Sequence, residues 1–132
     1  MKKIIVFLMC VFALSAMAAE PTCEDHGGSI ITAKDGTKFC KSDKNMNWWT
    51  AFAWCESQNR KLAEFATMCP GIPQSLDNRE GACPNLQGLG DNIWLWSSLA
   101  YRSGQAFFVN FSSGAVTWYG PRDDRYGYAL CE

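Results

Sequence analysis

Six cysteines that follow an export signal constrain this 132-residue chain more than any other feature. They are Cys23, Cys40, Cys55, Cys69, Cys83 and Cys131. An even number of cysteines in an exported chain predicts disulfide bonds, here three, although fifteen connectivities are allowed and the sequence does not choose among them. Zinc binding is the alternative. The chain has no C-x-x-C pair and a single histidine, so we prefer disulfides.

The first eighteen residues have the pattern of a secretory signal peptide. Two lysines precede an apolar run, and the segment ends in A-M-A at 16–18. A retained membrane anchor would need about 20 apolar residues, and the run at 4–14 is too short. We therefore predict a signal peptide at 1–18 and one domain at 19–132 that is secreted or periplasmic and does not insert into a membrane after cleavage.

Charge and motif content exclude two classes of function. Cleavage of the signal would leave ten Lys and Arg against thirteen Asp and Glu, a net charge of −3. Nucleic-acid partners require a basic patch, so we expect none. The chain lacks G-x-S-x-G and H-E-x-x-H, so we do not expect an enzyme. A small hydrolase that uses Asp123 and Asp124 is the alternative.

Residues 47–63 predict the main helix, which stops near Asn59 and continues as a short extended segment at 62–63. Its apolar stripe, expected to face the core, comprises Trp48, Ala51, Phe52 and Cys55. Trp49 and Trp54 point elsewhere around the helix. One of the two is a candidate for exposure, and an exposed tryptophan marks a contact site.

The remaining segments predict an α+β fold. An N-terminal hairpin is expected within 19–46, around the Asp35-Gly36 turn, and a short second helix at 64–68. A long loop without periodicity follows to residue 92, which a Cys69 to Cys83 bond would restrain. The aromatic and branched segments that predict four strands of a mostly antiparallel sheet are 93–98, 105–111, 115–119 and 126–131.

Two motifs resemble the C-type lectin-like fold. The helix reads A-x-x-W-C-E-S-Q-x-x-K-L-A, and the chain ends in Y-A-L-C-E. In that fold the helix cysteine is bonded to the terminal one, so the resemblance implies a bond between Cys55 and Cys131. It further implies a bond between Cys23 and Cys40 in the N-terminal hairpin, which leaves Cys69 with Cys83.

A second resemblance is to bacterial exported domains of the wider lectin-like superfamily, which are similar to surface adhesin modules. The matching segments are K-L-A-E-F, W-L-W-S-S and V-N-F-S-S-G. Two departures bear on function: C-P-N and W-Y-G stand where sugar-binding members carry E-P-N or Q-P-D and W-N-D, which supply calcium ligands. We therefore expect a module for adhesion or carbohydrate binding that recognises a glycan or a surface protein without a calcium-bridged sugar. The alternative is a structural subunit of a bacterial envelope or surface assembly.

The charged loop at 119–126 is the candidate ligand site. Its aromatic faces, forked guanidinium donors and carboxylate acceptors suit a sugar, and they belong to Tyr119, Arg122, Asp123, Asp124, Arg125 and Tyr126. The alternative is a solvated turn whose ion pairs contribute little. We expect no cofactor. A calcium site would have to use oxygens of Asp77, Asn78, Glu80, Asn85, Asp91 and Asn92, whose spacing matches no calcium-loop template.

Overall fold

The computed structural model describes residues 22–72, 83–100, 104–119 and 127–132. Within them lie one sheet of six strands, two α-helices and a short 3-10 segment, so the predicted α+β class is confirmed. In chain order the elements are η1 (Glu24–His26), β1 (Gly28–Thr32), β2 (Lys38–Met46), α1 (Trp48–Glu56), α2 (Phe65–Met68), β3 (Trp94–Ala100), β4 (Ala106–Asn110), β5 (Val116–Tyr119) and β6 (Gly127–Cys131).

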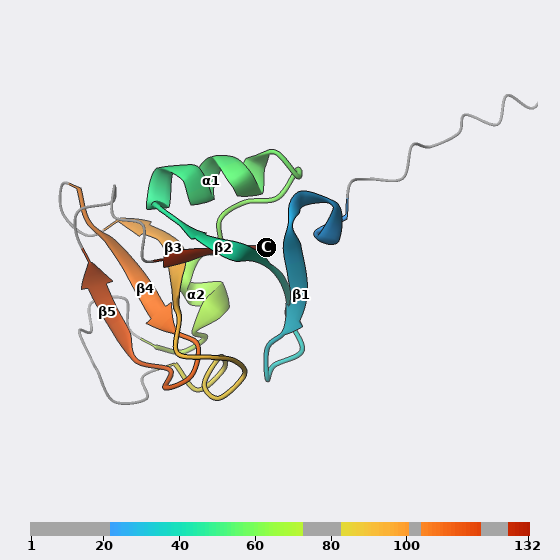
Figure 1. The fold of residues 1–132 in the computed structure, drawn as a ribbon. Helices are drawn as coiled ribbons and strands as arrows, with labels where there is room; N and C mark the ends of the chain where they lie inside the picture. Colours follow the sequence, from blue (N-terminus) through green and yellow to red (C-terminus); the bar gives the residue numbers. More distant parts are fainter. Residues whose placement is uncertain (1–21, 73–82, 101–103, 120–126) are drawn as a thin grey trace, which may run out of the picture.

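The strand order in the sheet is β1-β2-β6-β3-β4-β5 (Figure 1). All neighbouring strands are antiparallel except β3 and β6, which are parallel, so the prediction of a mostly antiparallel sheet is confirmed. The N-terminal hairpin belongs to this same sheet because β2 pairs with β6. The last strand thus joins the hairpin to the β3–β4–β5 meander.

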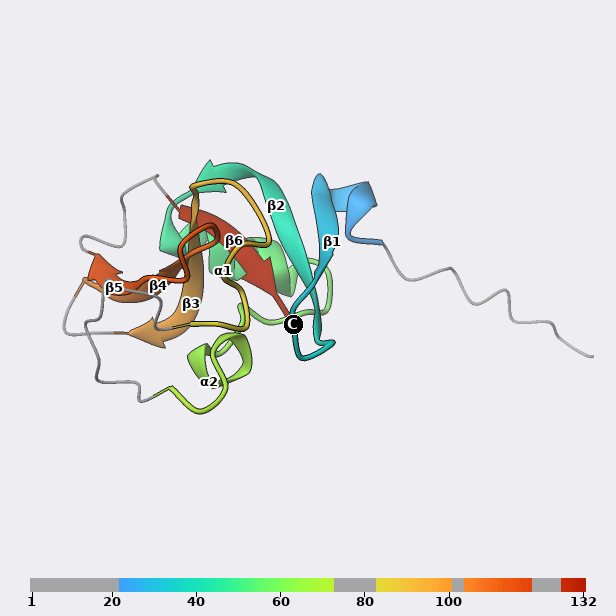
Figure 2. The same ribbon diagram turned by 90° about the horizontal axis from the view of Figure 1, so that it is seen from below.

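At strand β4 the sheet is buried on both faces. Every residue of β4 is buried, and neighbours alternate between two apolar clusters, with Phe107 in one and Phe108 in the other. Successive side chains of a strand point to opposite faces, so each cluster occupies one face. Helix α1 covers the face of Phe108, whereas α2 and Leu86 cover the face of Phe107 (Figures 1 and 2).

Helix α1 begins at Asn47, whose side-chain oxygen accepts a hydrogen bond from the Thr50 backbone N–H at 2.8 Å. The stripe residues Trp48, Ala51 and Cys55 are buried, as predicted. The expectation that Phe52 faces the core is wrong, since its exposed fraction is 37%. At about 100° per residue, Phe52 lies on the side of the stripe nearest to Trp49 and not at its centre.

The end of α1 agrees with the sequence prediction. Asn59 has a left-handed backbone with φ of 56°, which an asparagine adopts more readily than most residues. The chain then becomes extended: Leu62 forms a β-bridge with Cys131, and the Ala63 N–H donates to the Leu130 carbonyl at 2.7 Å. Helix and last strand are therefore joined by backbone hydrogen bonds as well as by sulfur.

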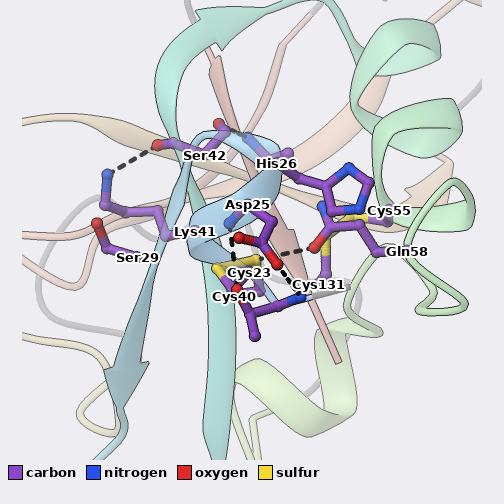
Figure 3. The surroundings of a disulfide bond; sticks show 12 residues. Cys23, Asp25, His26, Ser29, Cys40, Lys41, Ser42, Cys55, Gln58 and Cys131 are labelled. Carbon is purple, nitrogen blue, oxygen red and sulfur yellow. Dashed lines mark hydrogen bonds between the residues drawn. A yellow bond between two sulfur atoms is a disulfide. The ribbon is translucent and has the colours of Figure 1, made fainter. Parts of the chain in front are cut away.

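Three disulfides join Cys23 to Cys40, Cys55 to Cys131 and Cys69 to Cys83. These are the pairs that the resemblance implies. Cys40 and Cys131 are direct partners across β2 and β6, so two of the bonds lie side by side on the α1 face (Figure 3). The third ties the end of α2 to the loop on the opposite face.

No helix within the described ranges is long and apolar enough to cross a membrane.

Candidate functional site

The charged loop that the sequence nominates as a ligand site lies almost wholly outside the described residues. Tyr119 is the last residue of β5. The other five, Arg122, Asp123, Asp124, Arg125 and Tyr126, fall in the undescribed segment between β5 and β6. This segment connects the edge strand β5 to β6, with β3 and β4 between them in the sheet. The ligand site at 119–126 therefore stays a prediction.

Half of the residues considered for calcium are described, and two of these serve as structural ties. Asn85 accepts from the Asp35 N–H at 2.9 Å and donates to the Met68 carbonyl at 3.0 Å. The side-chain oxygen of Asn92 accepts from the Asn110 amide at 2.7 Å. Within the described part of the chain, no three His, Cys, Asp or Glu side chains gather where they could hold a metal ion. Asp77, Asn78 and Glu80 lie outside that part.

A different surface is well defined, and it lies on α1. Trp48 fixes the rotation of this helix: its exposed fraction is 7%, and its indole nitrogen donates to the Ser97 carbonyl on β3 at 2.8 Å. A buried indole N–H needs such a partner, so this hydrogen bond holds the Trp48 side of α1 against the sheet. The next residue, Trp49, is consequently directed away from the sheet.

Trp49 and Phe52 form what we call the α1 aromatic surface. Trp49 has an exposed fraction of 56% and Phe52 one of 37%, and residues three apart on a helix are neighbours on its surface. Both rings pack on Trp48, with ring centroids 4.8 Å (Trp49) and 5.6 Å (Phe52) from that indole. The two exposed rings are therefore held by a buried one, which reduces the entropy that they lose when a partner binds.

Trp54, the other candidate for exposure, has a structural role. It is half-buried, and its indole nitrogen donates to the His26 carbonyl at 3.0 Å. Gly28, at the start of β1, lies close enough that an added Cβ would stand 2.9 Å from the Trp54 ring. The N-terminal hairpin thus partly covers Trp54, whereas more than half of Trp49 is exposed.

An aromatic core supports the α1 aromatic surface from inside. Trp94 and Trp96 on β3 both stack on Phe108 of β4, at 4.5 and 5.0 Å between ring centroids. They belong to the same packed cluster as Trp48. The Trp96 indole also donates to the Met46 carbonyl at 2.9 Å, which fixes the chain just before α1. The exposed aromatics are thereby continuous with the rigid centre of the domain.

The sequence around this surface is uncharged. Between Lys44 and Glu56 the chain contains no Asp, Glu, Lys or Arg. Asn47 and Thr50 supply nearby polar groups, although the Asn47 oxygen is already used as the helix cap. Helix α1 itself therefore contributes no charged side chain to this surface before Glu56.

Lys41 is a half-buried cation on the other face of the sheet, since it is the register partner of Leu130. Its ammonium lies 5.0 Å from the centroid of the Tyr128 ring and donates to the Ser42 carbonyl at 2.8 Å. Burial lowers the pKa of Lys41, while Asp43 and Asp91 act in the opposite direction. Sheet residues thus already engage this cation, which takes no part in the α1 aromatic surface.

A shallow cavity of about 260 Å³ opens between α2 and the end of β3. Its lining residues are Glu64, Phe65, Ala66, Ser98, Leu99 and Ala100. The Glu64 carboxylate lies 3.2 Å from the Lys61 ammonium and already has a cationic partner. Glu64 is the sole titratable side chain among these lining residues, so they supply no acid–base pair.

The α1 aromatic surface was only partly predictable from the sequence. Helical geometry directs Trp49 and Trp54 away from the apolar stripe, but it does not say which of them another segment covers. Phe52 was assigned to the core, so its contribution to this surface was missed. The local signal for it is the absence of charge from 45 to 55, which is unusual for the outer side of a surface helix.

Comparison with models of known protein families finds no match to the chain, and comparison with curated proteins finds none either.

Proposed function

We propose that this chain is an exported C-type lectin-like binding module that recognises a glycan or a protein surface without a calcium-bridged sugar. The disulfide between Cys55 and Cys131 is the observation that carries the proposal, because it links the tryptophan-rich helix to the penultimate residue of the chain. That linkage is what the two sequence motifs imply. The α+β sheet, with the last strand at its centre, agrees with it.

Binding, and not catalysis, is the activity we assign. The sequence carries no recognised nucleophile or metalloprotease motif, and the described cavity offers one carboxylate that is already paired. Three disulfides support an oxidising compartment, in line with export to the periplasm or the cell exterior. Fractionation of the producing cell tests that location.

A glycan array with and without a chelator tests the glycan-binding form of the proposal. We expect binding that persists in the chelator, because the motifs that would supply calcium ligands for a sugar are replaced. In the loop at 119–126, Arg122→Ala should lower affinity at least about tenfold, since it removes a forked donor of the kind that recognises polar ligands. Lys34→Ala, a charge change in the exposed turn after β1, is the control and should leave affinity unchanged.

Two outcomes would count against this form. Binding that the chelator abolishes would disprove calcium independence. Glycan binding that survives Arg122→Ala would move the site away from the loop at 119–126.

A structural or subunit role in an envelope or surface assembly is the second candidate, and the α1 aromatic surface favours it. Exposed tryptophan and phenylalanine on a rigid support are typical of protein contact sites. Affinity purification from the producing cell should then recover a partner in stoichiometric amount, and Trp49→Ala should remove it. Ile30→Ala, at a residue 40% exposed on β1, is the matched control. A stoichiometric partner without glycan binding favours this second role; glycan binding alone rejects it.

A further inference from the structure

We propose that the disulfides Cys23–Cys40 and Cys55–Cys131 form one exchange unit. Reduction of the Cys23–Cys40 bond frees Cys40, which then displaces Cys55 from its disulfide with Cys131. The product is a Cys40–Cys131 bond that joins the adjacent strands β2 and β6. Helix α1, released from β6, would then keep only its noncovalent contacts. The inference rests on the arrangement of the cysteines and is independent of the proposed function.

The positions of Cys40 and Cys131 permit a direct bond between them. They are direct register partners in the antiparallel pair of β2 and β6. Opposite residues in such a pair have Cα atoms about 4.5 to 5.5 Å apart, which lies inside the range of about 4.4 to 6.8 Å found for disulfide-bonded cysteines. The rearranged bond therefore needs no change in strand register.

All four cysteines share one environment. Cys23, Cys40, Cys55 and Cys131 lie in the same buried cluster on the α1 face, and Figure 3 shows them together. Cys69 and Cys83 lie in the cluster on the opposite face of the sheet. The sheet thus separates the third disulfide from the other two and confines exchange to one set.

We expect reduction to begin at the Cys23–Cys40 bond. Cys23 precedes β1, which is an edge strand, whereas Cys131 lies on β6 in the middle of the sheet. Edge elements open locally more often than central ones.

The chemistry requires one external dithiol. The dithiol gives two electrons to the Cys23–Cys40 bond and is itself oxidised to a disulfide, leaving two protein thiols. Cys40, as thiolate, attacks the sulfur of Cys131; the Cys40–Cys131 bond forms as the Cys55–Cys131 bond breaks, and Cys55 leaves as a thiolate that takes up a proton from solvent. The product has one new disulfide and thiols at Cys23 and Cys55.

A pair of double variants tests the geometry. In Cys23→Ala/Cys55→Ala, air oxidation under native conditions should join Cys40 to Cys131, which peptide mapping detects together with the loss of both free thiols. The matched control, Cys23→Ala/Cys69→Ala, leaves thiols on opposite faces of the sheet and should form no Cys40–Cys83 bond. Persistent thiols at Cys40 and Cys131 in the first variant, or equal cross-linking in both variants, would overturn the proposal.

The unaltered protein provides a second test that does not depend on how variants fold. Limited treatment with dithiothreitol, followed by alkylation and mapping, should yield the Cys40–Cys131 peptide with alkyl groups on Cys23 and Cys55. Bonds that mix Cys69 or Cys83 with the other four cysteines should be absent. If such mixed bonds accompany the Cys40–Cys131 bond in similar yield, rearrangement proceeds through the unfolded chain and the exchange unit is rejected.

Discussion

The indole nitrogen of Trp48 donates a hydrogen bond to the backbone carbonyl of Ser97 at 2.8 Å, and this bond ties the first turn of α1 to strand β3. The cysteine that anchors α1 to β6 lies two turns further along the helix. Between them, one hydrogen bond and one disulfide determine which side of the helix faces the sheet. Trp49 lies about 100° around the helix from Trp48, outside the anchored stripe, and its exposed fraction is 56%.

We predict that Trp48→Phe and Trp49→Phe differ sharply in stability although the residues are neighbours. Trp48→Phe removes the donor to the Ser97 carbonyl and should lower the free energy of unfolding by about 1 to 3 kcal/mol. Trp49→Phe should change it by no more than about 0.5 kcal/mol, because the side chain is largely exposed. Urea denaturation followed by circular dichroism measures both. Equal effects would contradict the different roles of the two indoles.

The Trp96 indole leaves no room for a side chain at residue 127, which is a glycine. A Cβ at residue 127 would lie 2.1 Å from the Trp96 indole nitrogen, so Gly127→Ala must displace that ring and its hydrogen bond to the Met46 carbonyl. We predict a loss of about 2 to 4 kcal/mol, from overpacking plus a broken hydrogen bond. Gly71→Ala is the control: it meets nothing within 4 Å but has φ of +78°, and it should cost only about 1 to 2 kcal/mol.

A double variant separates crowding at Gly127 from a backbone effect. Gly127→Ala combined with Trp96→Leu should cost less than the sum of the two single changes, because leucine removes the atoms that the new methyl group meets. Thermal unfolding of the four proteins in this cycle gives the interaction energy. Strict additivity would show that the indole is not the obstacle.

We predict an order among the disulfides. Replacing Cys55 and Cys131 by alanine opens a loop with a sequence separation of 76. The chain-entropy model predicts that this lowers the free energy of unfolding by about 4.5 kcal/mol. Replacing Cys69 and Cys83 opens a separation of 14 and should cost about 3 kcal/mol. Equilibrium unfolding without reductant measures both losses. A smaller loss for the Cys55–Cys131 pair would contradict this order.

Asp35 should make stability depend on pH. The Thr37 backbone N–H donates to its carboxylate at 2.9 Å, and this contact lowers the pKa of Asp35 below its ordinary value of 3.8. Because the pKa is lower in the folded state, the ionised Asp35 carboxylate stabilises the fold above pH 3.8. This stabilisation is lost as pH falls through the folded-state pKa.

The variant Asp35→Asn keeps a side-chain oxygen but cannot ionise. Its difference in unfolding free energy from the unaltered protein should therefore be present at neutral pH and shrink below pH 3.8. Urea titrations across the acid range measure this difference. A difference that stays constant into strong acid would show that the charge of Asp35 does not matter.

Local sequence determined much of this fold. The sequence predicts the N-terminal hairpin, both helices and the four later strands. Their signals are helical and strand periodicity and the Asp35-Gly36 turn, which all depend on residues close together in the chain. The cysteine count predicted three disulfides, and the resemblance to a known fold implied their pairs. The ligand site at 119–126 stays a prediction from composition.

Tertiary structure decided what distant segments cover. The α1 sequence does not distinguish Trp49 from Trp54. The N-terminal hairpin partly covers Trp54, whereas Trp49 is exposed beside Trp48, whose indole is bonded to the Ser97 carbonyl. The pairing of β6 with both β2 and β3 sets Cys131 opposite Cys40, two residues far apart in sequence. Periodicity is a property of neighbouring residues, whereas exposure and sulfur proximity depend on which remote backbone packs against them. For that reason the chain itself specified its elements and its cysteines, and only the folded sheet produced the α1 aromatic surface and the adjacent disulfides.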